Sequence, residues 1–120
     1  MDTSALELIL PDGMLDYFDV TSFNRSANDY SIHLAERNLS PAEFAGQKLS
    51  SKGFLDEITI SDFPIRGKAC YLKVRRRRWL NEGTGKIVSR DWELVAKGTR
   101  MTREFAAFLK GIHRYDPGKL

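Results

Sequence analysis

The chain has 120 residues, of which 42% are hydrophobic and 11% aromatic. This length and composition predict one folded domain over residues 1–120 and argue against a disordered chain. The net charge of +3 is unevenly distributed, because residues 1–64 carry eleven acidic and four basic side chains, whereas residues 65–120 carry five acidic and fifteen basic ones. The asymmetry indicates an anionic partner for the second half, unless the acidic half neutralises the basic half within the fold.

The first half, residues 1–52, is expected to form an acidic hairpin followed by a short helix. Residues 15–21 and 30–36 read as strands, and the second alternates apolar and polar positions, so the pair predicts a β-hairpin. Residues 40–43, Ser-Pro-Ala-Glu, predict the start of the short helix, because Ser40 can cap it and Glu43 completes a capping box.

The second half, residues 53–115, is expected to form a basic sheet and a helix. Residues 54–61 predict a strand that ends before Pro64. Residues 65–80 then predict a long strand, the glycine-rich segment 81–85 a turn, and residues 86–95 the returning strand. The segment from Ile65 to Val95 would therefore be a long basic hairpin.

The last predicted element is a C-terminal helix that Thr102 can cap. Its apolar stripe has helical spacing and consists of Phe105, Phe108, Leu109 and Ile112. Pro117 and Gly118 are expected to end it. The fold class predicted from these elements is α+β: an antiparallel β-sheet of about five strands with the long basic hairpin, one short helix and the C-terminal helix.

Four consecutive arginines, Arg75 to Arg78, run directly into Trp79 at the end of a predicted strand. Strand alternation directs Arg75 and Arg77 to one face and Arg76 and Arg78 to the other, so both faces of a projecting tip would be cationic. The planar guanidinium suits phosphate, because it donates two parallel hydrogen bonds. An edge strand made soluble by charge is the alternative interpretation.

Two other features have a functional and a structural interpretation. Trp79 and Trp92, on the two arms of the predicted hairpin, are either cross-strand packing residues or platforms on which bases stack. Residues 97–103 form a basic connection into the N-terminus of the last helix. This segment is either an anion site or an ordinary capped loop.

The sequence offers no pattern for a metal, a cofactor or catalysis. Cys70, His33 and His113 are the soft ligands of the chain, and no two of them have ligand spacing. Three carboxylates, Asp56, Glu57 and Asp62, lack the spacing of a Ca²⁺ loop and are expected to form a solvated face. The single cysteine and the absence of a basic leader or a long apolar run favour a cytoplasmic protein with no membrane span.

Residues 53–67, together with the arginine run and residues 97–102, resemble a known group. The chain resembles the N-terminal-region proteins of the ISAon-type insertion-sequence transposases of Bacteroidetes, over most of its length from Leu6 to Tyr115. The resemblance implies a split transposase, in which this chain binds the DNA at the element's ends and a separate chain supplies catalysis. It implies Arg75 to Arg78, Lys97, Arg100 and Arg103 as contacts.

The predicted function is that of a DNA-binding, nucleoid-associated component of a transposition system, without a catalytic residue, metal or cofactor of its own. The expected partners are double-stranded DNA and a catalytic transposase subunit, and a homodimer stays open. An RNA or single-strand-binding module and a protein-interaction adaptor are the alternatives. The positions predicted to contact nucleic acid are Lys73, Arg75, Arg76, Arg77, Arg78, Trp79, Lys86, Arg90, Lys97, Arg100 and Arg103.

Overall fold

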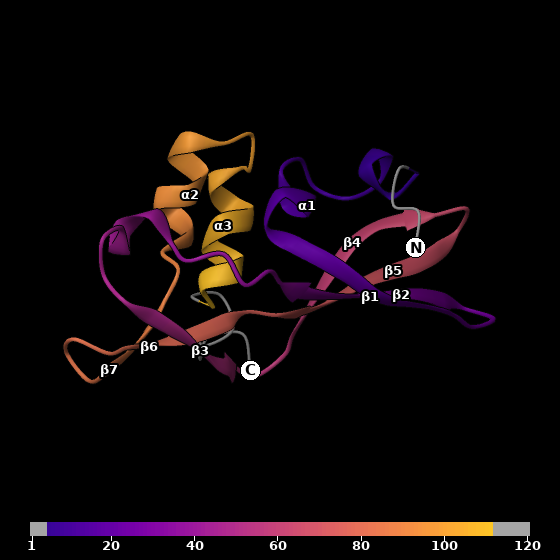
Figure 1. Cartoon of the computed structure of the whole chain (residues 1–120). Helices are drawn as coiled ribbons and strands as arrows, with labels where there is room; N and C mark the ends of the chain where they lie inside the picture. The colour runs from indigo at the N-terminus through magenta and orange to yellow at the C-terminus, as the bar shows by residue number, and fades with distance from the viewer. Residues whose placement is uncertain (1–4, 112–120) are drawn as a thin grey trace, which may run out of the picture.

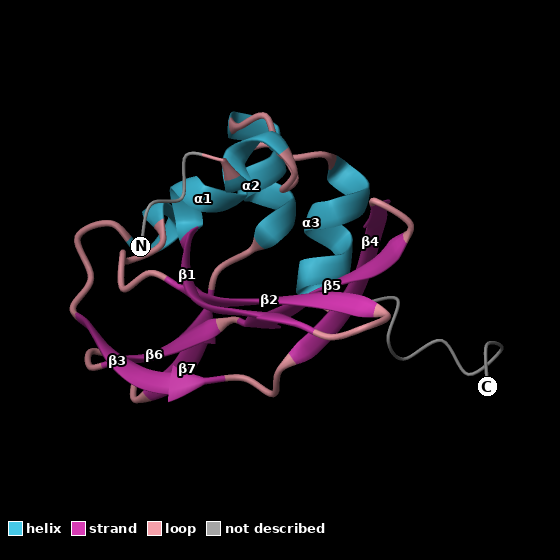
Figure 2. Cartoon of the chain, turned by 90° about the vertical axis from the view of Figure 1, so that its right-hand side faces the viewer, coloured by secondary structure: helices cyan, strands magenta, loops and turns pink. Residues whose placement is uncertain are grey.

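The computed structural model describes residues 5–111, which fold into an α+β structure with two β-sheets and a layer of helices (Figures 1 and 2). The larger sheet has the strand order β1-β2-β5-β4. Its strands are β1 (Phe18–Arg25), β2 (Asp29–Glu36), β5 (Lys68–Arg75) and β4 (Ile58–Ile65). β2 and β5 are parallel and the other neighbours antiparallel, which corrects the expectation of a purely antiparallel sheet.

The smaller sheet has three antiparallel strands in the order β3-β6-β7. They are β3 (Leu49–Phe54), β6 (Arg77–Asn81) and β7 (Lys86–Ser89). The described part of the chain therefore has seven strands, where the sequence predicted about five. β5 and β6 follow one another along the molecule and lead the chain from the larger sheet into the smaller one (Figure 1).

The hairpin predicted in the first half is confirmed as the antiparallel pair β1 and β2. Its first strand begins later than predicted, because residues 14–17 form the short helix α1 (Met14–Tyr17). Gly13 precedes this helix with φ of +83°, and a Cβ there would lie 3.4 Å from the backbone nitrogen of Met101. Only glycine adopts this conformation without strain, so the turn formed by residues 11–13 redirects the chain into α1 before the strand starts.

The hairpin predicted from Ile65 to Val95 is confirmed at its turn, where β6 pairs with β7, but its length is wrong. Its first strand divides at Arg76, whose backbone oxygen accepts a hydrogen bond from the nitrogen of Leu55 at 2.8 Å. Its second strand ends at Ser89, because Asp91 caps a helix by accepting a hydrogen bond from the nitrogen of Glu93 at 3.0 Å. The remaining residues of the predicted strand form α2 (Trp92–Gly98).

Two shorter elements also differ from the prediction. The strand predicted over residues 54–61 consists of the end of β3 and the start of β4, separated by residues 55–57. Pro64 lies inside β4, which tolerates it because β4 is an edge strand with an irregular register between Asp62 and Ile65. The short helix is a 3-10 turn, η2 (Ala42–Phe44), without the predicted cap from Ser40.

The C-terminal helix is confirmed as α3 (Arg103–Lys110), with the Thr102 side chain accepting a hydrogen bond from the nitrogen of Phe105 at 3.2 Å. Gly111 ends it with a left-handed conformation. Ile112, Pro117 and Gly118, which the prediction also used, lie outside the described residues.

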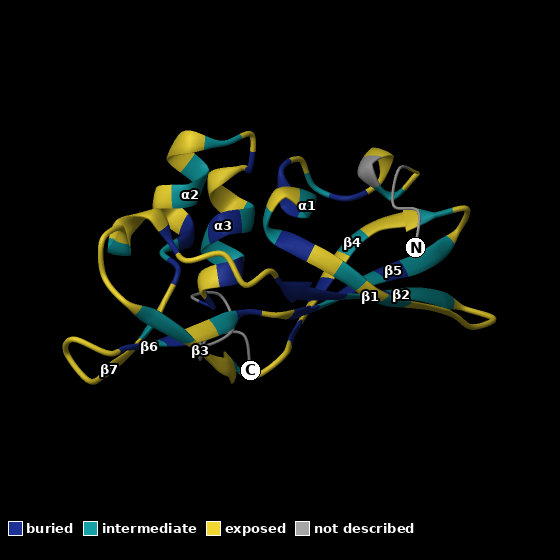
Figure 3. Cartoon of the chain, in the orientation of Figure 1, coloured by how far each residue is buried: buried dark blue, intermediate teal, exposed yellow. Residues whose placement is uncertain are grey.

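The core lies where the helices cover one face of the larger sheet (Figures 2 and 3). Leu72 and Val74 of the central strand β5 face this layer and are fully buried, as are Ala106 and Leu109 of α3. Because residues of a strand alternate between the two faces, Tyr71, Lys73 and Arg75 face away from the helices. The opposite face of the larger sheet therefore carries the polar and charged positions of β5.

Candidate nucleic-acid interface

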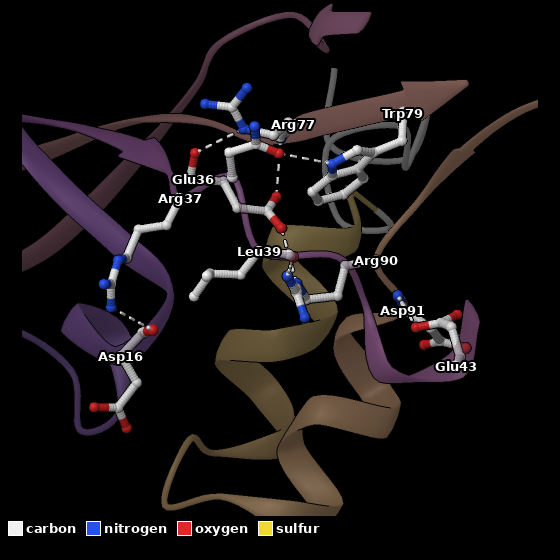
Figure 4. A network of polar contacts seen from close by, with 10 residues as sticks. Asp16, Glu36, Arg37, Leu39, Glu43, Arg77, Trp79, Arg90 and Asp91 are labelled. Atoms are coloured by element: carbon white, nitrogen blue, oxygen red, sulfur yellow. Dashed lines mark hydrogen bonds and ion pairs between the residues drawn. The ribbon is translucent and has the colours of Figure 1, made fainter. Parts of the chain in front are cut away.

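A buried carboxylate, Glu36 at the end of β2, organises the surroundings of the arginine run (Figure 4). Its side chain is fully buried. One oxygen, Oε2, accepts a hydrogen bond from Arg90 Nε at 2.8 Å, and Oε1 accepts one from the backbone nitrogen of Arg77 at 2.9 Å. Burial raises the pKa of Glu36, whereas the hydrogen bond and charge of Arg90 oppose that rise. The carboxylate thereby holds the first residue of β6 in place.

Arg90 is a structural residue and not a surface contact. It is buried, and its guanidinium also donates to the backbone oxygen of Leu39. The guanidinium carbon lies 5.0 Å from the ring centre of Tyr17, 5.8 Å from that of Trp79 and 5.7 Å from that of Trp92. In this position the cation neutralises Glu36 and packs among aromatic rings, so it cannot reach a phosphate.

Arg76 is also used inside the fold. It is buried, and its NH1 donates to the backbone oxygen of Leu109 at 2.6 Å. Leu109 belongs to the last turn of α3, where the exposed carbonyl groups and the helix dipole favour a cation. The predicted projecting tip with cations on both faces is therefore wrong: Arg76 joins the two sheets to the C-terminal helix.

The remaining basic residues of β5 and the start of β6 form a row, which we call the cationic stripe and define as Lys73, Arg75 and Arg77. Lys73 and Arg75 occupy the face of β5 that points away from the helices. Arg77 continues the row beyond the break at Arg76, since Arg75 and Arg77 both place their guanidinium carbons 4.6 Å from the ring centre of Phe54. The predicted common side of Arg75 and Arg77 is confirmed.

The side chains of the cationic stripe donate to neutral oxygens, although the backbone nitrogen of Arg77 donates to the Glu36 carboxylate. Lys73 Nζ donates to Thr59 Oγ1 at 3.2 Å, and Arg77 donates to the Ser51 hydroxyl and to the backbone oxygen of Glu36. Within residues 5–111, no member of the stripe forms an ion pair with a carboxylate. Lys73 and Arg75 therefore have no described carboxylate partner, whereas the charge of Arg77 also acts on the buried carboxylate of Glu36.

Further cations lie on the smaller sheet, where strand alternation places Arg78 on the face of β6 opposite to Arg77. Arg78 is exposed, and its Nε donates to the backbone oxygen of Lys52 on β3 at 2.9 Å. Lys52 is itself exposed. Lys86, another predicted contact, is exposed at the start of β7, beside the turn that joins β6 to β7.

One carboxylate moderates the positive charge of this face. Glu57 precedes β4, and its Oε1 lies 3.8 Å from His33 Nδ1 on β2. Because β5 lies between β2 and β4, this contact reaches across the strand that carries Lys73 and Arg75. A negative charge at this position opposes the approach of an anion to the stripe.

The aromatic residues near the stripe differ from those predicted. Trp79 is buried, and its Nε1 donates to Asn38 Oδ1 at 3.1 Å. Trp92 is buried on α2 and stacks on Phe18 with ring centres 5.3 Å apart. Both tryptophans are packing residues; Trp79 has Val88 as a cross-strand neighbour, whereas Trp92 lies in a helix. The ring beside the cations is Phe54, which sequence reasoning missed because its partner strand, β6, was predicted to pair only with residues 86–95.

The second group of predicted contacts lies elsewhere. Lys97 is in the last turn of α2, Arg100 in the connection between α2 and α3, and Arg103 at the start of α3. All three are exposed. The connection between the helices lies on the far side of the helical layer from β5 and β6 (Figures 1 and 2). The stripe and this group therefore cannot contact one short stretch of nucleic acid together.

The described residues contain no cluster of three or more His, Cys, Asp and Glu side chains arranged to hold a metal ion. Among residues 5–111 there is also no helix with the length and apolar character needed to cross a membrane. Burial raises the pKa of the Cys70 thiol, which lies in the core between sheet and helices. Comparison of the chain with protein-family models, curated proteins and solved structures finds no match.

Proposed function

We propose that this protein binds the backbone of double-stranded DNA through the cationic stripe, as the DNA-binding component of a transposition system. The observation that supports this function is the row of three basic side chains along β5 and the start of β6, none of which forms an ion pair with a carboxylate of the described residues. Two other predicted contacts, Arg76 within the run and Arg90, are buried in the fold. The stripe is thus a small surface on which the basic side chains have a defined spacing, in contrast to the predicted strand tip with cations on both faces.

The spacing of the stripe suits a phosphate backbone. Alternate residues of a strand are separated by about 6.6 Å, so Lys73 to Arg77 span roughly 13 Å. One strand of B-DNA presents a phosphate about every 3.4 Å of helix axis, so this span matches roughly four phosphates. Three contacts would give a slope of about −3 in a plot of log affinity against log salt concentration.

Duplex DNA is favoured over a single strand as the ligand, because cations already lie over the aromatic rings near the stripe. Single-strand binding relies on aromatic faces that are open to stacking by bases. The ring of Phe54 carries the guanidinium groups of Arg75 and Arg77, and the ammonium of Lys73 lies 5.9 Å from the ring centre of Tyr71. A base would have to displace these cations, whereas a phosphate would bind to them directly.

The test is a binding measurement with matched charge changes. We expect Lys73→Gln with Arg75→Gln to weaken binding to a 20-base-pair duplex by about 10-fold or more and to reduce the salt slope by about 2. Fluorescence anisotropy measures both quantities. The salt concentration is varied from about 50 to about 200 mM, the range over which such affinities fall steeply.

The matched control is Lys97→Gln with Arg100→Gln, which likewise removes one lysine and one arginine charge, but from the other side of the molecule. Its affinity and salt slope should stay close to those of the unaltered protein. Equal losses in both variants would mean that net charge alone governs binding, and the stripe would not be the interface. Tighter binding of single-stranded DNA or RNA than of duplex at the same salt would overturn the choice of ligand.

The role in transposition rests on the sequence resemblance described above. Its test uses duplexes that carry the terminal repeats of the mobile element that encodes the chain, beside shuffled duplexes of equal composition. A component that recognises element ends should prefer the repeats by about 1,000-fold or more. Equal affinities would leave a DNA-binding protein without the end-recognition role.

A further inference from the structure

A groove on the side of the molecule away from the stripe combines apolar walls with acidic edges. It has a volume of about 540 Å³ and lies between the turn η1 (Leu6–Leu8), β4 and α3. Leu8, Ile9 and Phe63 line it together with Phe105 and Phe108 of α3. Leu8 is 87% exposed and Phe63 is 85% exposed, the two most exposed large apolar side chains among the described residues. Exposed apolar side chains gathered at one concave place are typical of a protein-binding site.

The edges of the groove are negatively charged. Asp12, Asp62 and Glu104 line it, and within residues 5–111 none of them forms an ion pair. They come from three separate segments, namely the turn after η1, the irregular part of β4 and the first turn of α3. A partner that covers the apolar walls would therefore also place its polar groups beside three carboxylates.

We propose that this groove binds a short amphipathic segment of another protein, in which two or three bulky apolar side chains are flanked by lysine or arginine. The apolar side chains would cover Leu8, Phe63 and Phe105, and the basic ones would lie beside the carboxylates. Such a segment buries apolar area and gains charge complementarity at the rim, the arrangement of peptide-in-groove recognition. The proposal is independent of nucleic-acid binding, because the groove and the cationic stripe share no residue.

A symmetric dimer through this groove is disfavoured by charge. A two-fold axis would bring the same surface of two copies together. Asp12, Asp62 and Glu104 would then face their own counterparts across an apolar interface, where like charges repel most strongly. The occupant is consequently expected to be a basic partner and not a second copy of the same face.

The test uses two synthetic helical peptides with leucines at identical i, i+3, i+4 and i+7 positions. One carries lysine and the other glutamate at the remaining positions. The full chain should bind the lysine peptide with a Kd on the order of 10 µM, and the glutamate peptide at least about 10-fold more weakly. Fluorescence anisotropy of the labelled peptides measures both affinities.

Variants locate the binding site. Phe63→Ser should weaken binding of the lysine peptide about 10-fold, whereas Ile87→Ser, a matched change at an exposed apolar residue on the smaller sheet, should leave it unaltered. Removal of two rim charges by Asp12→Asn with Glu104→Gln should weaken it about 5-fold. The matched pair Asp56→Asn with Glu82→Gln should have little effect.

Three outcomes would overturn the proposal. Undiminished binding by the Phe63→Ser variant would place the peptide elsewhere. A dimer in sedimentation that Phe63→Ser dissociates would identify a second copy as the occupant. Much tighter peptide binding by the variant Tyr115→Ser with Leu120→Ser would mean that residues 112–120 themselves compete for the groove. The variant Lys73→Gln with Arg75→Gln should bind the peptide normally, which separates this test from that of DNA binding.

Discussion

Replacement of Arg90 by methionine tests whether the buried Glu36–Arg90 pair supports the fold around the stripe. Methionine retains much of the apolar stem of arginine beside Tyr17, Trp79 and Trp92, and it removes the charge and the hydrogen bonds. Glu36 would keep its contact with the backbone nitrogen of Arg77 but lose the contact with Arg90 at 2.8 Å. The Arg90→Met variant therefore contains a buried carboxylate without a compensating cation on Oε2.

The expected loss of stability is large. Removal of one partner of a buried ion pair costs about 3–5 kcal/mol in free energy of unfolding, because the other charge stays desolvated. For a chain of this size, roughly 4 °C in melting temperature corresponds to each kcal/mol, so the melting temperature should fall by about 12–20 °C. Arg78→Met is the matched control at an exposed arginine, and it should change the free energy of unfolding by about 0.5 kcal/mol or less.

The pH dependence has a defined sign. Burial raises the pKa of Glu36 in the folded state above its ordinary value. The folded state thus binds a proton more readily than the unfolded state, and this contribution to stability is present at low pH and lost as pH rises through the folded pKa. Without Arg90, which opposes that rise, the pKa of Glu36 becomes higher still. The deficit of Arg90→Met relative to the unaltered protein should therefore be smaller at pH 5 than at pH 7.

Urea unfolding followed by circular dichroism at the two pH values measures these quantities. The double variant Glu36→Gln with Arg90→Met keeps an acceptor for the Arg77 nitrogen without a buried charge, and it should recover most of the lost stability. A loss below about 1 kcal/mol for Arg90→Met would refute the reasoning. So would a deficit that is equal at both pH values, since the ionised carboxylate would then not be its cause.

Two further predictions concern the stripe and the C-terminal helix. Glu57→Gln removes the carboxylate that reaches across β5 to His33. The affinity for duplex DNA at low salt, measured by fluorescence anisotropy, should therefore rise by up to about 5-fold, as expected for an exposed charge interaction of about 1 kcal/mol or less. A fall in affinity would show that Glu57 organises the stripe. Thr102→Ala removes the cap on the Phe105 nitrogen and should lower the free energy of unfolding by about 1 kcal/mol in urea titrations, whereas Ser89→Ala, at an exposed hydroxyl on β7, should not.

Local sequence patterns predicted the elements that depend on near neighbours. The β1–β2 hairpin follows from alternation around a polar turn, and the cap by Thr102 follows from a hydroxyl placed before an apolar stripe. The common side of Arg75 and Arg77 also follows from strand alternation, because it concerns adjacent residues of one extended segment. In each case the interacting groups are close in the chain, so their geometry is set before the rest of the fold forms.

The strand predicted over residues 65–80 ends earlier in the structure, because its end depends on a partner that is distant in the sequence. Residues 65–80 read as one extended segment, and the backbone at Arg76 leaves the larger sheet because it pairs with Leu55. Trp92 is predicted to lie in a strand because residues 86–95 follow the turn and read as the returning arm of the hairpin. The capping bond of Asp91 and the packing of Trp92 on Phe18 instead place it in a helix. Tertiary packing overrode local propensity at this position.

The sequence by itself determined the α+β class, the concentration of positive charge in the second half of the chain and the composition of the arginine run. Tertiary structure alone decided which of those cations are available to a partner. Glu36 and the last turn of α3 are distant in sequence from the run, and they take Arg90 and Arg76 into the interior. Buried charges require a compensating group, and only the folded chain brings that group near. The side chains of the cationic stripe instead stay outside the core, and none of them forms an ion pair among the described residues.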